Sequence, residues 1–306
     1  MKYKLILCLI ILFIFSAIVF ASNTPPPIPT EYWGEALIDG EQAPAGTPIT
    51  SDYGNTEVTG DGYYDVILTG GDSPLTYLDD PTCAIHEAAD EACINCSTNA
   101  ADENYCIEGP QDGDEVYLIL NGANITVEWD INLSDETDLS VLSLASGWNL
   151  RSLNLDESDN SIEKMIQGLT TPIVVWNYNE SGDWNVYDTE APFPWLNTLN
   201  TMEYGKAYWI KSNINQNFGF AGTPAGTKVI NLKTGWNFVG FNNSEVLLPD
   251  AISGLTTPIV VWEYNESGDW NVYDTEAPFP WLNTLQKMRQ TMGYWIKSTT
   301  GQVWGI

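Results

Sequence analysis

Positive charge is almost absent from the first half of this chain. Residues 22–150 contain no lysine or arginine, and the whole sequence holds 11 basic against 41 acidic residues, a formal net charge of −30. Proteins that bind nucleic acid or anionic membranes need clustered lysine and arginine to neutralise phosphate. We therefore exclude nucleic acid as a partner and expect a solvated acidic surface.

Histidine is almost as rare, because His86 is the only one in the chain. The sequence therefore has too few histidines to support a Ser-His-Asp or Cys-His catalytic relay, or a zinc site with several histidine ligands. Carboxylates are abundant, so composition alone leaves a glycosidase-like pair open, although no cleft that would raise the pKa of one member can be recognised. We predict no catalytic residue and no enzyme activity.

The sequence also predicts no cofactor and no metal site. Acidic turns at 112–115 and 156–159 leave loose Ca²⁺ binding through oxygen ligands as an alternative. Neither turn matches an EF-hand loop, so we expect both to be ordinary polar turns.

Long apolar runs are confined to the amino terminus. Lys2 and Lys4 precede the apolar run Leu5–Phe20, and Val19-Phe20-Ala21 fits a small-residue cleavage site, a pattern typical of a secretory signal. An uncleaved anchor is the alternative, but this run is shorter than the roughly 20 residues that a spanning helix needs. We predict a signal peptide at 1–21, a secreted or cell-surface location, and no membrane insertion after cleavage.

A Pro-rich linker at 22–30 precedes a series of short β-prone segments separated by Gly- and Asp-containing turns. Short strands with turn signals at this spacing favour an antiparallel β-sandwich, here over residues 31–133. The expected strands are Tyr32–Ile38, Thr47–Ser51, Glu57–Thr59, Tyr63–Leu68, Glu115–Leu120 and Ile125–Trp129.

The turn residues of this segment carry a resemblance. Tyr32-Trp33-Gly34, Asp39-Gly40, Ala43–Thr47 and Gly60–Tyr63 resemble the carboxypeptidase-regulatory-like and Ig-like β-sandwiches of prokaryotic secreted surface proteins. The resemblance covers residues 31–133 and implies a surface-protein domain. An insertion at 78–107 departs from the pattern.

Four cysteines follow the signal, and all of them fall in this insertion. An even number in an exported chain predicts two disulfides, and the sequence leaves three connectivities open. A four-thiolate zinc site is the alternative, but such sites usually need two close pairs, and only one is present here. The cysteines are Cys83, Cys93, Cys96 and Cys106.

A nearly identical tandem copy dominates the second half of the chain. Residues Gly168–Leu199 recur at Gly254–Leu285 with one difference in 32, Asn177 against Glu263. Repetition at a fixed offset indicates two like folding units. We place them at 139–221 and 227–306, each with several strands and a short helix, near 161–168 in the first unit.

Both units resemble tandem modules of archaeal and bacterial extracellular proteins that begin with Gly-Trp-Asn and finish with Gly-Tyr-Trp-Ile. The matching residues in the first unit are Gly147-Trp148-Asn149 and Ala207–Ile210. This resemblance implies a surface or extracellular protein and supplies no catalytic residue. The predicted fold is mainly β: an antiparallel β-sandwich with a disulfide-stapled insertion, then two small β-rich repeats.

Aromatic residues are abundant, with 13 Trp and 15 Tyr. Sugar rings stack on exposed aromatic faces, but a small β-unit is expected to bury most of its large aromatics. Alternation along 172–178 predicts Trp176 and Tyr178 on the core face with Val174, and Asn177 on a wet face. The expected glycan-binding residues therefore lie in the Pro-rich loops, namely Phe193 and Trp195 with their copies Phe279 and Trp281.

Six Asn-X-Ser/Thr sequons predict N-glycosylation wherever the host glycosylates. The predicted acceptors are Asn95, Asn124, Asn132, Asn179, Asn242 and Asn265. Together these features predict an exported, non-enzymatic cell-surface or extracellular protein with a structural or adhesion role, whose partners are envelope or extracellular proteins or glycans. A secreted glycan-binding protein is the alternative, and a secreted hydrolase is a more distant one.

Overall fold

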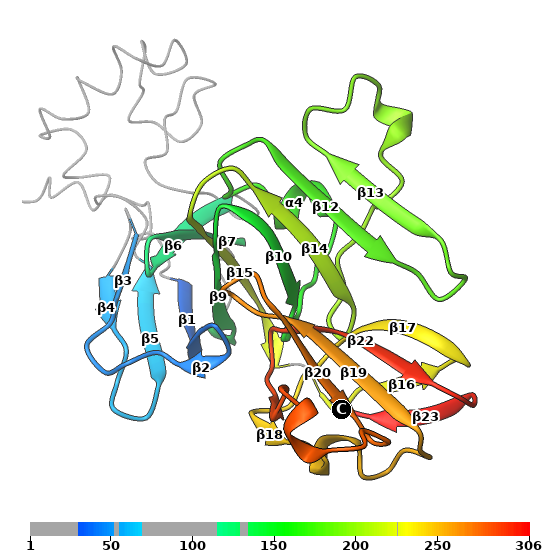
Figure 1. Cartoon of the computed structure of the whole chain (residues 1–306). Coiled ribbons are helices and arrows are strands. Elements are labelled where there is room, and N and C mark those ends of the chain that lie inside the picture. The colour runs from blue at the N-terminus through cyan, green and yellow to red at the C-terminus, as the bar shows by residue number, and fades with distance from the viewer. Residues whose placement is uncertain (1–29, 52–54, 69–114, 129–133, 225) are drawn as a thin grey trace, which may run out of the picture. The chain divides into compact units, whose positions relative to one another are not determined.

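The computed structural model describes residues 30–51, 55–68, 115–128, 134–224 and 226–306, which belong to one compact unit (Figure 1). These residues are mainly β, as the sequence predicted. The predicted signal peptide, nearly all of the linker, the insertion with its cysteines and His86, and the acceptors Asn95 and Asn132 lie outside the described residues. They stay predictions.

Two sheets enclose the first core. One has the strand order β4 (Asn55–Glu57), β3 (Pro48–Thr50), β6 (Glu115–Leu120), β7 (Ala123–Glu128). The other is built around β1 (Thr30–Ile38), which pairs with β2 (Glu41–Gln42), β5 (Tyr63–Leu68), β8 (Ser134–Glu136) and β9 (Asp138–Leu144). Along β5 and β6 exposed and buried residues alternate, so the period-2 pattern of the sequence directs one side of each strand into the core.

The sandwich and the first repeat share a sheet. Strand β1 pairs in parallel with β8 and β9, an arrangement that the hairpin-like turn signals did not indicate. On its other side β9 pairs with β15 (Gln216–Pro224), and β15 pairs with β11 (Leu155–Asp156). Strands from both ends of the first repeat thus continue the sandwich sheet.

Each repeat also contains a four-stranded antiparallel sheet, and the two have equivalent strand orders. The first is β10 (Gly147–Ser152), β14 (Ala207–Ser212), β12 (Ile173–Tyr178), β13 (Trp184–Asp188). The second is β17 (Gly235–Gly240), β22 (Gly293–Ser298), β19 (Ile259–Tyr264), β20 (Trp270–Asp274). The remaining strands of the second repeat pair as β16 (Val229–Leu232) with β23 (Gln302–Gly305) and β18 (Val246–Leu247) with β21 (Lys287–Met288).

Helical structure in the repeats is short. The helix predicted near 161–168 is α4 (Ile162–Met165), and at the matching place the second repeat has the 3₁₀ helix η3 (Asp250–Ile252). Two further 3₁₀ turns, η2 (Pro194–Leu196) and η4 (Pro280–Leu282), follow the fourth strand of each sheet, β13 and β20. These turns present the predicted aromatic loops.

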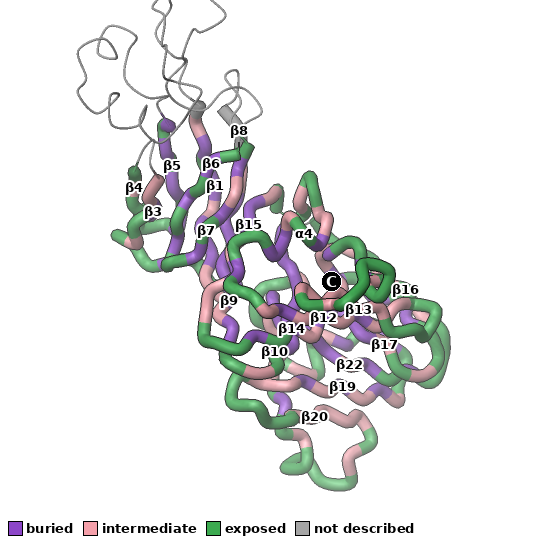
Figure 2. Tube along the Cα trace, turned by 90° about the horizontal axis from the view of Figure 1, so that it is seen from above, coloured by how far each residue is buried: buried purple, intermediate pink, exposed green. Residues whose placement is uncertain are grey.

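The inner face of each four-stranded sheet covers a core of its own, and Figure 2 shows buried segments running along these strands. The core residues recur at equivalent positions. They are Ile173, Val175, Tyr208 and Ile210 in the first repeat and Ile259, Val261, Tyr294 and Ile296 in the second. Full burial of one such aliphatic side chain contributes about 1.5–3 kcal/mol, so each repeat has its own source of stability.

The prediction for the two faces of 172–178 is wrong. In β12 the buried positions are Ile173, Val175 and Asn177, whereas Trp176 and Tyr178 lie half-buried on the opposite face. Burial of Asn177 is possible because its Nδ2 donates to the carbonyl oxygen of Ala207 at 2.9 Å. The aliphatic side of the strand fills the core, and the aromatic side faces outward.

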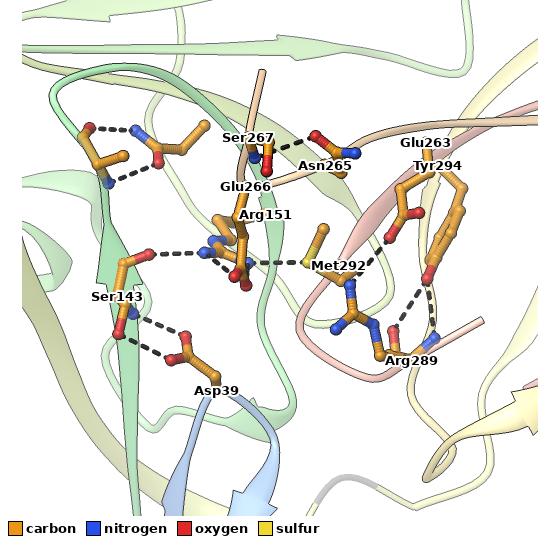
Figure 3. Close-up of polar contacts among 12 residues, drawn as sticks. Asp39, Ser143, Arg151, Glu263, Asn265, Glu266, Ser267, Arg289, Met292 and Tyr294 are labelled. Atoms are coloured by element: carbon orange, nitrogen blue, oxygen red, sulfur yellow. Dashed lines mark hydrogen bonds and ion pairs between the residues drawn. The ribbon is translucent and has the colours of Figure 1, made fainter. Parts of the chain in front are cut away.

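The second repeat has Glu263 in place of Asn177, and this residue is buried with a partner of another kind. The Glu263 carboxylate forms an ion pair with Arg289 at 3.4 Å (Figure 3). Burial raises the pKa of Glu263, and the nearby Arg289 opposes that rise. Arg289 occupies the position of Glu203 in the first repeat, so two sequence differences form one compensated pair.

Candidate functional site

The outer faces of the two four-stranded sheets, turned away from the cores, carry the same aromatic pattern. Cross-strand pairing places Trp148 opposite Lys211, and Trp176 opposite Trp209. Because directly paired residues of a sheet point to the same face, these side chains lie in two adjacent rows. Their counterparts in the second repeat are Trp236, Lys297, Trp262 and Trp295.

The two outer faces contact each other through reciprocal ring pairs. Trp209 of the first repeat packs on Tyr264 of the second, with ring centroids 5.1 Å apart. Trp295, the counterpart of Trp209, packs on Tyr178, the counterpart of Tyr264, at 5.3 Å. When residue i meets j′ and residue j meets i′, the two units are related by an approximate two-fold axis.

Residues at this axis meet their own counterparts. A Cβ atom added to Gly293 would lie 3.0 Å from the Cβ of Ala207, the equivalent residue of the first repeat. A Cβ added to Gly240 would lie 2.7 Å from the Cβ of its counterpart, Ser152. In both pairs one repeat has a small side chain and the other has glycine, because the close approach leaves room for only one.

Two grooves of nearly equal size lie beside this contact. The first groove, of about 530 Å³, is lined by Trp148, Trp176, Trp184, Trp209, Tyr264 and Trp270. The second groove, of about 520 Å³, is lined by Tyr178, Trp184, Trp236, Trp262, Trp270 and Trp295. These two sets are counterparts one for one, so the approximate axis relates the grooves as well as the repeats. Each groove takes side chains from both repeats.

The grooves are open to solvent. Trp148 is 42% exposed, its counterpart Trp236 is 44% exposed, and the shared residues Trp184 and Trp270 are 46% and 45% exposed. Exposed contiguous aromatic surface of this kind marks a binding site more often than a packing accident. An open trough suits a ligand that is longer than the groove.

The Gly-Trp-Asn motif explains how Trp148 reaches the groove. Gly147 has a φ of 113°, a conformation that favours glycine. Asn149 closes the turn, because its Oδ1 accepts from the N–H of Ala145 at 2.8 Å and its Nδ2 donates to the Ala145 carbonyl at 2.9 Å. Between these two residues, Trp148 is held on the outer face. Gly235 and Asn237 form the same turn around Trp236.

A lysine stands beside each groove. The Nζ of Lys211 lies 5.8 Å from the ring centroid of Trp148, and the Nζ of Lys297 lies 5.8 Å from that of Trp236. Within the described part of the chain neither lysine forms an ion pair, whereas three other lysines do. Each groove therefore combines an aromatic floor with one available donor group.

The predicted loop residues have a different arrangement. Phe193 stacks on Trp195 with ring centroids 4.5 Å apart, and Phe279 and Trp281 repeat this geometry. Trp195 and Trp281 are each 72% exposed, and neither pair lines a groove. These loops stay a predicted glycan-binding surface, separate from the grooves.

Sequence reasoning missed the groove tryptophans because it assigned the aromatic side of β12 to the core. The segregation of residue types was an available signal. Val174, Trp176 and Tyr178 alternate with Ile173, Val175 and Asn177, so both faces of the strand are mainly apolar and the large aromatic residues lie on one of them. A strand that is apolar on both faces needs a cover on each face.

Polar contacts fix the first repeat against its neighbours, as Figure 3 shows. Arg151 donates to the Ser143 carbonyl at 2.6 Å and forms an ion pair with Glu266 of the second repeat at 3.3 Å. Ser143 in turn donates its N–H and its hydroxyl to the carboxylate of Asp39, each at 2.7 Å. These polar contacts form one continuous series that links the sandwich with both repeats. The series runs from Asp39 through Ser143 and Arg151 to Glu266.

Three of the predicted glycosylation acceptors within the described residues lie at or near the surface. Asn124 is exposed, and Asn179 and Asn265 are partly exposed at the start of the same acidic turn in each repeat. The side-chain amide of Asn242 differs, because its nitrogen and oxygen are both buried without a hydrogen-bond partner. Glycosylation itself stays a prediction at all six sites.

The described residues hold no group of three or more His, Cys, Asp or Glu side chains placed to bind a metal ion. Within the same residues, no helix has both the length and the apolar character required to cross a membrane.

Comparison of the chain with protein-family models, with curated proteins and with solved structures found no match. The two family resemblances inferred from sequence motifs therefore stay predictions.

Proposed function

We propose that this protein is an exported, non-enzymatic glycan-binding protein of the cell surface or extracellular space, and that the two aromatic grooves are its binding sites. The observation that carries the proposal is the recurrence of the same tryptophan-lined groove in both repeats. Export rests on the amino-terminal sequence pattern.

The chemistry of the groove favours sugars. A pyranose ring with equatorial hydroxyls presents C–H groups on both faces, and these meet the negative face of an indole ring favourably. The open groove accommodates a chain of such rings, and Lys211 or Lys297 can donate to a hydroxyl at its edge. The net charge of −30 repels polyanions, so we propose neutral β-linked chains such as β-1,4-linked glucose or N-acetylglucosamine.

The lining residues also favour binding over hydrolysis. Enzymes that cleave glycosidic bonds typically use a pair of carboxylates at the bond. The six side chains that line each groove are all Trp or Tyr. A structural or adhesion role at the surface agrees with this proposal, since attachment to a polysaccharide provides one.

A glycan array with the mature chain and tryptophan variants tests the proposal. We expect binding to β-linked neutral glycans that falls roughly tenfold or more in Trp148→Ala/Trp236→Ala. Trp33→Ala, which removes an exposed tryptophan from the sandwich, is the matched control and should bind normally. Loss of binding in Phe193→Ala/Trp195→Ala, together with full binding in Trp148→Ala/Trp236→Ala, would show that the Pro-rich loops and not the grooves bind the glycan. No glycan bound by the wild type would overturn the function.

A further inference from the structure

The two grooves meet. Trp184 and Trp270, which are counterparts of each other, line both grooves, whereas the other lining residues belong to one groove each. The approximate two-fold axis therefore relates two grooves that lie side by side and share two walls.

This axis restricts how a polymer can lie in the grooves. A half-turn that exchanges the two grooves also reverses any path that crosses from one to the other through the axis. A polysaccharide has a reducing and a non-reducing end, so its two directions are chemically different. One chain laid along such a path would make its matched contacts in one groove and reversed contacts in the other.

We infer that the two grooves hold two separate glycan chains, so that one protein molecule joins two strands of polymer. The inference rests on the proposed function and adds to it the number of ligands and the relation between them. Its physical basis is the set of reciprocal contacts, Trp209 with Tyr264 and Trp295 with Tyr178, which define the axis. Sharing of Trp184 and Trp270 keeps the two strands next to each other.

Two sites on one compact unit also predict a difference between short and long ligands. A hexasaccharide occupies one groove at a time. A dense polymer surface engages both grooves at once, and the second contact forms at a high effective concentration. Attachment to such a surface should be roughly 10²-fold to 10⁴-fold tighter than binding of one short chain to one groove.

Calorimetric titration of the mature chain with cellohexaose and with N-acetylchitohexaose measures the number of sites. We expect two molecules per chain for the wild type, one for Trp148→Ala and one for Trp236→Ala. The double variant should bind both hexasaccharides roughly tenfold or more weakly than the wild type does. Circular dichroism and melting curves of all variants check that the exposed positions leave the fold intact.

A stoichiometry of one in the wild type, or complete loss of binding in either single variant, would show one composite site and overturn the inference while leaving glycan binding in place. Absence of binding to both hexasaccharides would overturn the inference together with the proposed ligand class.

Light scattering with hydroxyethyl cellulose and glycol chitin measures the joining of strands. We expect the wild type to form large particles that dissolve in excess hexasaccharide. Each single-groove variant should bind the same polymer, as measured on an immobilised surface, without forming particles. Particles of equal size in the wild type and in both single variants would overturn the inference.

Discussion

Position 177 of the first repeat and its counterpart 263 show how one residue change is absorbed. Asn177 satisfies its buried amide with a backbone carbonyl, whereas Glu263 needs a cation and finds Arg289. The carboxylate of Glu263 is only 4% exposed, while the Arg289 side chain is 37% exposed. The pair is therefore asymmetric, and the buried carboxylate is the member that depends on its partner.

Removal of the cation is expected to be costly. Arg289→Ala leaves the Glu263 carboxylate buried without a counter-ion, and we expect unfolding free energy to fall by about 3 kcal/mol. In a Glu263→Asn background, Arg289→Ala should lower the unfolding free energy by less than about 1 kcal/mol. The new amide carries no charge, and it can donate to the Gly293 carbonyl as Asn177 donates to the Ala207 carbonyl. Urea denaturation of the wild type, the two single variants and the double variant gives the coupling free energy between Arg289 and Glu263. Equal costs in both backgrounds would show that the ion pair does not matter.

Asp138 is a second buried carboxylate, and it lies between the sandwich and the first repeat. Its Oδ1 accepts the N–H of Glu35 at 2.8 Å, and burial raises the pKa of Asp138 to about 6 from 3.8, with the neighbouring Glu35 and Glu136 carboxylates adding to the rise. A carboxyl with a raised folded-state pKa costs stability while ionised, and this cost disappears as the pH falls through about 6 toward 4.

Asp138→Asn should remove this pH dependence, because the amide oxygen can still accept the Glu35 N–H without carrying a charge. We expect the variant to melt at a higher temperature than the wild type at pH 7, and this difference to shrink as the pH falls to 4.5. Because both proteins lose the same charge elsewhere on acidification, the difference between their melting temperatures isolates Asp138. A difference that is constant from pH 4.5 to 7 would contradict the assignment.

At the scale of elements, the close approach of the two four-stranded sheets depends on glycines at their contact. A Cβ on Gly240 would lie 1.9 Å from the Oγ and 2.7 Å from the Cβ of Ser152, and 3.0 Å from the carbonyl oxygen of Lys206. Gly240→Ala is expected to lower unfolding free energy by about 1–3 kcal/mol through overpacking.

Compensation can be tested in the counterpart residue. Ser152→Gly removes the two closest atoms, so Gly240→Ala/Ser152→Gly should regain most of the lost stability in thermal unfolding. Gly305→Ala serves as the control for a glycine-to-alanine change, because a Cβ there would meet no atom within 4 Å. A double variant no more stable than Gly240→Ala would mean that the counterpart contact does not set the crossing distance.

The positions of several strands could be predicted from the sequence. Which face of a strand is buried and which strands pair with each other could not. β5 and β6 match the predicted ranges residue for residue, because alternation and flanking turn residues are local signals. The face of β12 that enters the core could not be assigned, since both faces are apolar and the outer one is covered by a repeat 86 positions away. The parallel pairing of β1 with β9 depends on residues more than 100 positions apart, which no local pattern encodes.

The grooves escaped prediction for the same reason. Tyr178 is half-buried because Trp295 of the second repeat packs on it, and its exposure cannot be estimated from one repeat alone. The tandem copy was visible in the sequence, but the two-fold relation between the copies depends on the residues at the axis.

At the scale of the whole molecule, the described residues form three main cores and a smaller apolar cluster between the two repeats, made of Leu150, Ala207 and Phe238. The core of the second repeat draws only on residues from Ile230 to Ile306, whereas the core of the first draws on strand β9, which also belongs to the sandwich sheet. The second repeat therefore has the material to fold alone, at the expense of exposing the aromatic face that it buries against the first. That face is self-complementary, because its counterpart in the first repeat has almost the same residues.

Residues 226–306 expressed alone should consequently form a symmetric dimer that reproduces the contact between the repeats. In such a dimer Trp295 of each copy packs on Tyr264 of the other, as Trp295 packs on Tyr178 in the intact chain. Each Gly293 and each Gly240 would then face its own copy at the axis with no side chain on either residue, while Phe238 would take the place that Leu150 has beside Gly293. Light scattering coupled to size-exclusion chromatography should give a dimer at micromolar concentration, and Trp295→Ala should shift it to monomer. A folded fragment that stays monomeric would mean that the aromatic contact is too weak to hold the repeats together without the linking chain, and that the orientation of the two grooves depends on the polar links through Arg151 instead.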